Sequence, residues 1–138
     1  MKQFIVFFAL MFIFIFMLLQ WTANETSHIK RNTLINIVES HAQDARKDGY
    51  FTSENISSLK EEIHSKLYIP ENEIRVSVTD TPKYRTDTFD ENELIRYKIE
   101  VPIKNVVAMA SFFDLGESEN MYWYSEDGAV TSERLIDK

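Results

Sequence analysis

The sequence of 138 residues contains no cysteine and only three glycines and three prolines. The absence of cysteine excludes disulfide bonds, thiolate metal sites and cysteine nucleophiles. So little glycine and proline argues against a flexible linker, a low-complexity tract or a disordered tail. A glycine-rich phosphate loop is excluded as well, because Gly49, Gly116 and Gly128 each stand alone. The composition is that of a folded protein with room for about one domain.

Positive charge is also scarce. The net charge is −7, and Lys2 is the only charged residue before Ala23, so the rest of the chain carries −8 from 14 basic and 22 acidic residues. A surplus of carboxylates repels phosphate backbones, and no basic cluster offsets it. We therefore expect no nucleic acid among the partners of this protein.

The sequence contains no pattern typical of a catalytic or metal-binding site. No GxSxG motif is present, and the three histidines form neither an HExxH motif nor an i, i+4 pair. His41 lies near the apolar stripe of a predicted helix, which favours a half-buried packing role, whereas His28 and His64 are interpreted as surface residues. We expect a protein that is not an enzyme and has no catalytic, cofactor-binding or metal-binding residues and no cofactor.

An acidic run is the one cluster that suggests a cation site; it consists of Asp87, Asp90, Glu91 and Glu93. The run lacks the alternating oxygen ligands and the central glycine of a calcium-binding loop, and Phe89 stands where a ligand is needed. We interpret it as a solvated loop between strands.

A long hydrophobic run lies near the N-terminus. Residues Phe4 to Leu19 are sixteen consecutive apolar residues. As a helix they extend about 24 Å, just short of a hydrocarbon core of about 30 Å. A signal peptide is the alternative, but Trp21 before Ala23 makes a poor cleavage site. We expect residues 1–23 to be a single-pass transmembrane anchor in the cell membrane, with a cytoplasmic N-terminus, and residues 24–138 to be an extracytoplasmic domain.

Two helices are predicted from the hydrophobic periodicity. The first continues from the anchor, because no glycine or proline occurs before Gly49, which is placed to end a helix over residues 3–48. Its apolar stripe comprises Leu34, Val38, His41, Ala42 and Ala45. The second helix starts at an N-cap of Thr52 or Ser53 and stops before Pro70. Its stripe comprises Ile56, Leu59, Ile63 and Leu67.

Strands are predicted beyond Pro70, where the hydrophobic period changes to two. Residues 74–78 and 95–101 alternate between apolar and polar side chains. Residues 121–124 and 129–131 flank Glu126-Asp127-Gly128, which predicts a hairpin. Residues 106–113 are ambiguous between a strand and a buried helix. The predicted fold class is α+β: a long N-terminal helix, a short second helix and a small antiparallel sheet of three to five strands.

Three consecutive aromatic residues, Tyr122, Trp123 and Tyr124, lie in one of these predicted strands. A strand places Trp123 on one face of the sheet and both tyrosines on the other. One face is expected to be core. The other is interpreted either as ordinary amphipathic surface or as a contact surface, since tyrosine and tryptophan are common interface anchors.

The order of these segments resembles that of pilins and, locally, of TadE-like pilus-assembly proteins and related small membrane proteins of low-GC Gram-positive bacteria. Besides the anchor, the matching segments are AQDARKDGYFT (Ala42–Thr52), IRYKIEVPI (Ile95–Ile103) and GAVTSERL (Gly128–Leu135). Type IV pilins are cut after a glycine that precedes the hydrophobic helix, and they carry a glutamate early within it. This chain has neither, so we do not expect processing by a prepilin peptidase.

The resemblance implies a membrane-anchored, pilin-like structural or assembly component of a pilus, secretion or conjugation apparatus. Its implied partners are membrane lipid and other pilin-like subunits or assembly proteins. The alternative is a membrane-tethered extracytoplasmic binding or sensor domain that does not polymerise.

Overall fold

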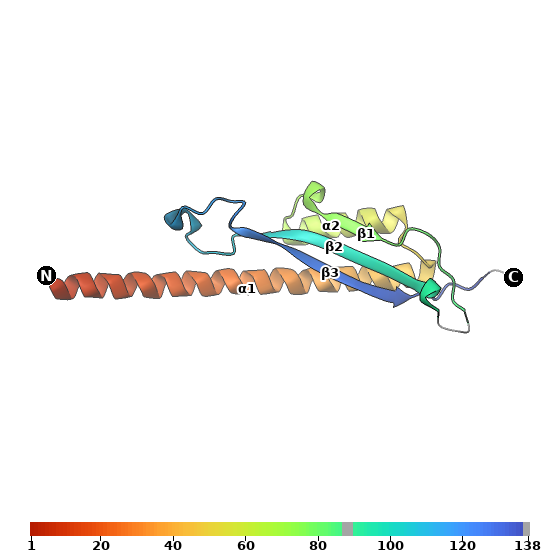
Figure 1. The fold of residues 1–138 in the computed structure, drawn as a ribbon, viewed down its shortest axis with the longest axis horizontal. Coiled ribbons are helices and arrows are strands. Elements are labelled where there is room, and N and C mark those ends of the chain that lie inside the picture. The colour runs from red at the N-terminus through yellow and green to blue at the C-terminus, as the bar shows by residue number, and fades with distance from the viewer. Residues whose placement is uncertain (87–89, 137–138) are drawn as a thin grey trace. The chain divides into compact units, whose positions relative to one another are not determined.

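A computed structural model describes residues 1–86 and 90–136. Two α-helices, α1 (Lys2–Asp48) and α2 (Ser53–Leu67), precede strands β1 (Arg75–Val78), β2 (Leu94–Lys104) and β3 (Met121–Thr131). In the described residues the loops contain the short 3-10 helices η1 (Glu71–Glu73), η2 (Glu91–Glu93) and η3 (Ala110–Phe113). The strands form an antiparallel sheet in the order β1-β2-β3 (Figure 1). The predicted α+β class is confirmed.

The chain divides into two compact units, each made of two segments. Unit 1 comprises residues 1–30 and 103–122, and unit 2 comprises residues 31–102 and 123–138. Helix α1 and strands β2 and β3 contribute residues to both units.

Helix α1 is the single long helix that the sequence predicts. In unit 2 it buries the predicted stripe, Leu34, Val38, His41, Ala42 and Ala45. It ends at Gly49, whose φ of +86° lies in the left-handed region and whose N–H donates to the Ala45 carbonyl at 2.8 Å. A Cβ atom at Gly49 would also overlap the Lys83 carbonyl oxygen, so both backbone conformation and close approach require glycine here.

Helix α2 begins at the predicted N-cap, Thr52, whose hydroxyl oxygen accepts from the Asn55 N–H at 3.1 Å. Its apolar stripe is buried at Leu59, Ile63 and Leu67, as expected from the 3.6-residue period. The helix ends at Leu67, and Tyr68 follows in the left-handed conformation.

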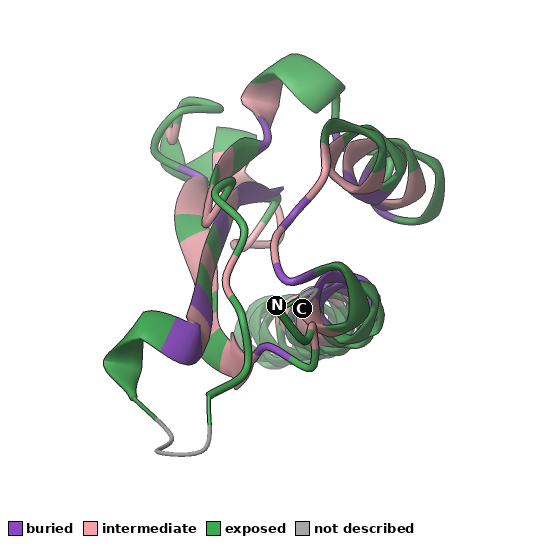
Figure 2. Ribbon diagram, turned by 90° about the vertical axis from the view of Figure 1, so that its right-hand side faces the viewer, coloured by how far each residue is buried: buried purple, intermediate pink, exposed green. Residues whose placement is uncertain are grey.

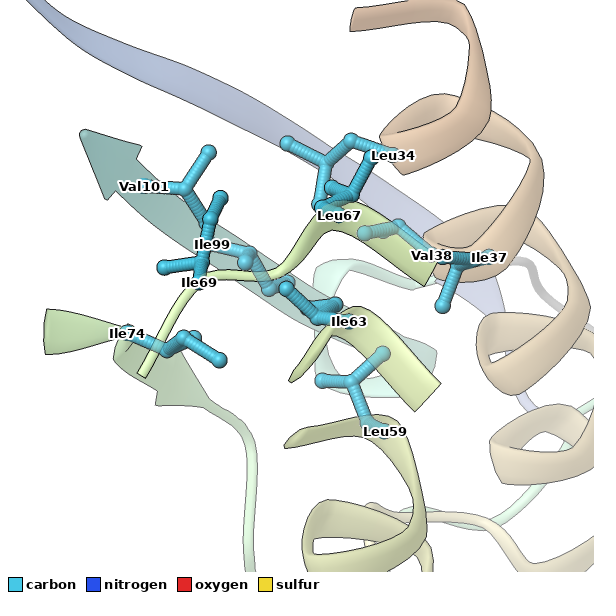
Figure 3. Close-up of a cluster of buried hydrophobic side chains, with 10 residues drawn as sticks. All are labelled: Leu34, Ile37, Val38, Leu59, Ile63, Leu67, Ile69, Ile74, Ile99 and Val101. Atoms are coloured by element: carbon cyan, nitrogen blue, oxygen red, sulfur yellow. The ribbon is translucent and has the colours of Figure 1, made fainter. Parts of the chain in front are cut away.

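The main core of unit 2 lies between the sheet and the two helices. Strands β1 and β2 pair antiparallel, with Val76 opposite Ile99. Ten buried residues from α1, α2, the α2–β1 connection and β2 form the principal cluster: Leu34, Ile37, Val38, Leu59, Ile63, Leu67, Ile69, Ile74, Ile99 and Val101 (Figure 3). Buried positions of α1, α2 and the sheet face one another in this unit (Figure 2).

The predicted hairpin at residues 121–131 is wrong. Strand β3 runs without a turn from Met121 to Thr131, through Asp127 and Gly128. A Cβ atom at Gly128 would lie 2.5 Å from the Tyr97 hydroxyl oxygen. Glycine is needed there because a side chain from the neighbouring strand approaches the backbone, and the same residue type that marks turns also marks such approaches.

The segment over residues 106–113 is neither a strand nor a buried helix, the two alternatives that its sequence allows. It forms a loop that enters the four-residue helix η3. Phe112 and Phe113 are 64% and 48% exposed. The apolar character of this segment therefore does not serve the core of unit 2.

Candidate functional site

The apolar part of α1 is the most exposed hydrophobic surface in the described residues. The large side chains between Phe4 and Leu19 are almost all at least 40% exposed. Within the described ranges, α1 is the one helix long and apolar enough to cross a membrane, and none of its most apolar 18-residue window is buried. This segment is compatible with a transmembrane or signal anchor.

A loop of unit 1 lies against this apolar helix. The Phe112 ring packs 5.4 Å from the Phe12 ring, and the Phe113 ring packs 5.5 Å from the Phe16 ring, measured between centroids. The two loop rings also meet edge to face at 5.4 Å. Residues nearly a hundred positions apart thus form one aromatic cluster on the side of α1.

Two side-chain amides hold the loop to the helix and to itself. The Gln20 amide donates to the Val106 carbonyl and accepts from the Ala108 N–H, both at 3.0 Å. The Asn120 amide accepts from the Val107 N–H at 2.6 Å and donates to the Val107 carbonyl at 3.2 Å. These bonds pair polar backbone groups of an otherwise apolar segment, as a neighbouring strand would.

The contact with the loop gives residues 16–30 of α1 a one-sided burial pattern. The residues with reduced exposure are Phe16, Gln20, Ala23, Ser27 and Lys30, which recur at the spacing of one helix face. The positions between them are exposed. Between residues 16 and 30, α1 therefore has one covered face and one free face, whereas residues 1–15 are exposed on all sides.

A cavity of about 600 Å³ lies between this face and the loop, entirely within unit 1. Its walls combine hydroxyl, amide and aliphatic groups with the charged side chains of Lys30, Lys104 and Glu117. A cavity of this size can hold a small molecule or a lipid headgroup.

His41 has more polar contacts than a packing residue requires. It is 9% exposed, which agrees with the half-buried position that the sequence predicts. Its Nδ1 lies 2.8 Å from the Asn55 side-chain oxygen, and its Nε2 lies 3.0 Å from a Glu62 carboxylate oxygen. An imidazolium can donate to both oxygens, whereas a neutral ring can donate to one. This cluster joins α1 to α2.

The acidic run is not entirely solvated, so that interpretation is wrong for Glu93. Asp90 is the N-cap of η2 and forms a capping box with Glu93, which is fully buried. Hydrogen bonds from the Thr86 hydroxyl and backbone hold the pKa of the Glu93 carboxyl below its usual value, against the opposing effect of burial. Asp87 lies outside the described residues. The run thus includes a capping carboxylate that fixes the start of β2.

The aromatic triplet behaves partly as predicted. Trp123 is 41% exposed, and the Arg75 guanidinium lies 3.9 Å from its ring centroid. Tyr124 packs against the main core on the opposite side of the strand. The exposed Arg75 side chain of β1 therefore stacks on the exposed Trp123 ring of β3.

The loop beside α1 is the feature that sequence reasoning missed. Residues 105–113 contain no charge and end in two phenylalanines, which signals an apolar surface but not its location. Gln20 bonds to Val106 and Ala108, which lie 86 and 88 positions further along, and no periodic pattern in the sequence predicts this contact. In the described residues, no three histidine, aspartate or glutamate side chains are grouped to hold a metal ion.

The continuous helix α1 thus supplies an exposed apolar segment in unit 1 and a buried stripe in unit 2 of this α+β fold. No known protein family, curated protein or solved structure matches the chain. The resemblance to TadE-like proteins therefore stays a prediction.

Proposed function

We propose that this protein is a membrane-anchored, pilin-like structural subunit. The observation that carries the proposal is that the two parts of α1 have different environments. The first part of this continuous helix exposes a long apolar surface, and the last part supplies a buried stripe to the core of unit 2. A helix of this kind can anchor a subunit in a membrane and also pack against identical helices.

The free face of α1 supports subunit packing. Phe7, Phe14 and Trp21 repeat every seven residues and are 60%, 62% and 70% exposed. Positions two residues apart on a helix are roughly 200° apart. Trp21 therefore points away from Ala23, which lies on the face covered by the loop. In a pilin-like assembly, neighbouring anchors meet through this free face.

The absence of cysteine makes a crosslinking test direct. Trp21→Cys and Ala23→Cys variants of the full chain are expressed in membranes and treated with a short bifunctional maleimide. Trp21→Cys should give crosslinked dimers, and Ala23→Cys, only two positions away, should give few. A double variant with cysteines at Phe7 and Trp21 should give a ladder of larger species.

A monofunctional maleimide provides the control, because it establishes that both thiols react. Equal crosslinking at the two positions would indicate random collision. No crosslinking from a reactive Trp21→Cys thiol would contradict a structural subunit.

A membrane-tethered binding domain is the second candidate, and the cavity of unit 1 favours it. This candidate would be preferred if the chain stays in the membrane fraction but remains monomeric in the crosslinking test.

A further inference from the structure

We propose that residues 105–113 form a second membrane-contacting element, which places the Phe112 and Phe113 side chains among lipid acyl chains beside α1. The inference rests on the membrane anchoring proposed above and adds a second point of contact with the bilayer. The partner is the apolar part of a lipid bilayer.

The loop rings continue the apolar surface of the helix. Phe12 and Phe16, which contact Phe112 and Phe113, lie within the uninterrupted apolar run of α1. If that run occupies the hydrocarbon core, groups packed beside Phe12 and Phe16 lie at a similar depth. The two loop rings are 64% and 48% exposed, so a large part of each faces whatever surrounds the helix. Large adjoining apolar surfaces of this kind mark contact with a membrane or a protein.

The distribution of charge favours the acyl region over the headgroups. Residues 105–113 contain no charge. The exposed Lys104 precedes them and the exposed residues that follow include Asp114, Glu117 and Glu119, so the flanks are net acidic. Carboxylates are repelled by anionic headgroups, so charge does not attract this segment to an acidic membrane. The contact is therefore expected to be hydrophobic and independent of anionic lipid.

The hydrogen bonds of the segment suit an apolar environment. A lipid-exposed backbone needs internal partners for its polar groups, and irregular loops seldom provide them. Here the Gln20 and Asn120 amides pair with backbone groups of Val106, Val107 and Ala108. Further along, the Phe112 N–H donates to the Met109 carbonyl and the Leu115 N–H to the Ala110 carbonyl. Internal partners are thus present for these backbone groups of the segment.

The backbone conformation indicates a fixed shape. Within the described ranges, four non-glycine residues have a positive φ, and Asn105, Met109 and Asp114 are three of them. Such conformations persist where surrounding contacts determine them. Hydrogen bonds of the Gln20 and Asn120 side-chain amides hold residues 106–108. The ring contacts of Phe112 with Phe12 and of Phe113 with Phe16 hold the end of the segment beside α1.

Depth measurements on the full chain in bilayers test the proposal. Single cysteines at Ser111 in the loop, Leu10 in the anchor and Glu61 on α2 are labelled with an environment-sensitive fluorophore. All three positions are exposed, and Ser111→Cys leaves both phenylalanines in place. Vesicles of phosphatidylcholine carry quenchers on their acyl chains. The Ser111 label should be quenched several-fold more than the Glu61 label and should emit at shorter wavelength, as the Leu10 label does.

The other outcomes separate this inference from the proposed anchoring. Quenching at Leu10 with a water-accessible label at Ser111 would overturn the inference and leave the anchor intact. Loss of quenching at both positions would contradict both proposals. A Ser111 label shielded from lipid and water alike, and released when the protein is diluted in lipid, would assign the surface to a second copy of this chain.

Two further measurements sharpen the result. Replacing Phe112 and Phe113 together by serine should move the Ser111 label back toward water and leave the Leu10 label unchanged. Adding anionic lipid to the vesicles should leave quenching at Ser111 unchanged, and a several-fold increase would contradict a purely hydrophobic contact.

Discussion

The two parts of α1 reverse the usual relation between hydrophobicity and burial. The more apolar part, in unit 1, is mostly exposed, whereas the more polar part, in unit 2, buries Leu34, Val38 and Ala45 almost completely. Hydrophobic side chains leave water whenever an apolar environment is available. Unit 2 provides that environment from its own chain. The described residues leave most of the apolar part of unit 1 uncovered, which is why an external partner is proposed.

The loop of unit 1 also exposes apolar side chains that the described residues cover only in part. Its aromatic rings cover part of Phe12 and Phe16 but leave much of their own surface exposed. In unit 2 a comparable ring, Phe51, is 1% exposed and packs against Tyr97. Residue type is therefore a poor guide to environment here, and the availability of covering groups decides it.

A matched pair of leucine truncations gives the largest expected contrast. Leu59→Ala removes a fully buried side chain from the core of unit 2 and should cost about 2–5 kcal/mol of unfolding free energy. Leu10→Ala removes a side chain that is 62% exposed and should leave the unfolding of unit 2 unchanged. Denaturant unfolding of both variants in detergent, followed by circular dichroism, measures the difference. Equal destabilisation would mean that the apolar part of α1 is packed within the protein.

The elements that the sequence predicted correctly are those specified by local rules. The 3.6-residue stripes placed α1 and α2, Gly49 and Thr52 marked a helix end and a helix start, and alternation located β1 and β2. The errors arose where one local signal has two physical causes. The Asp127-Gly128 pair predicts a turn. The glycine is needed instead because the Tyr97 side chain approaches the backbone at this position, and no local sequence pattern reveals that contact.

The candidate site was less predictable than the fold. The apolar run of α1 was visible at once because sixteen adjacent residues share one property. The contacts of Gln20 with Val106 and Ala108 depend on tertiary structure, and a glutamine after an apolar run is equally typical of a membrane interface. Burial of Glu93 was missed for a related reason, since its role as a cap depends on the backbone of Thr86 and Asp90.

A glycine substitution made in each unit gives an intermediate effect. Gly128→Ala should destabilise unit 2 by about 1–3 kcal/mol, because the new Cβ would lie 2.5 Å from the Tyr97 hydroxyl oxygen. Gly116→Ala is the control in unit 1, where the nearest atom to the new Cβ is a Glu119 carboxylate oxygen at 3.6 Å, an ordinary contact. Thermal unfolding of the two variants provides the measurement.

An asparagine at the same position distinguishes the two roles that glycine can have. A type I′ turn tolerates asparagine, so Gly128→Asn would be nearly neutral if residues 126–128 formed the hairpin predicted from the sequence. A continuous β3 has no space for the larger side chain, and Gly128→Asn should then be worse than Gly128→Ala. The opposite ranking would contradict the structure of this strand.

The smallest expected effect concerns the polar contact between α1 and α2. The Lys66 ammonium, 2.6 Å from Glu62, and the His41 ring hold the pKa of the Glu62 carboxyl below its ordinary value of 4.5, against the opposing effect of partial burial. A lowered folded-state pKa stabilises the protein above pH 4.5, and this contribution is lost as the pH falls through the folded-state pKa. The Glu62 side chain is 33% exposed, so solvent screening limits the contribution to less than about 1 kcal/mol.

Glu62→Gln should therefore be slightly less stable than wild type at neutral pH and should approach it in acid. Unfolding curves between neutral pH and pH 3 measure this difference, with Glu61→Gln, an exposed neighbour, as the control for removal of one charge. If the difference in unfolding free energy is constant across the pH range, Glu62 acts through packing rather than through its charge. The contact between α1 and α2 would then be stabilised in the same way as the apolar core beside it.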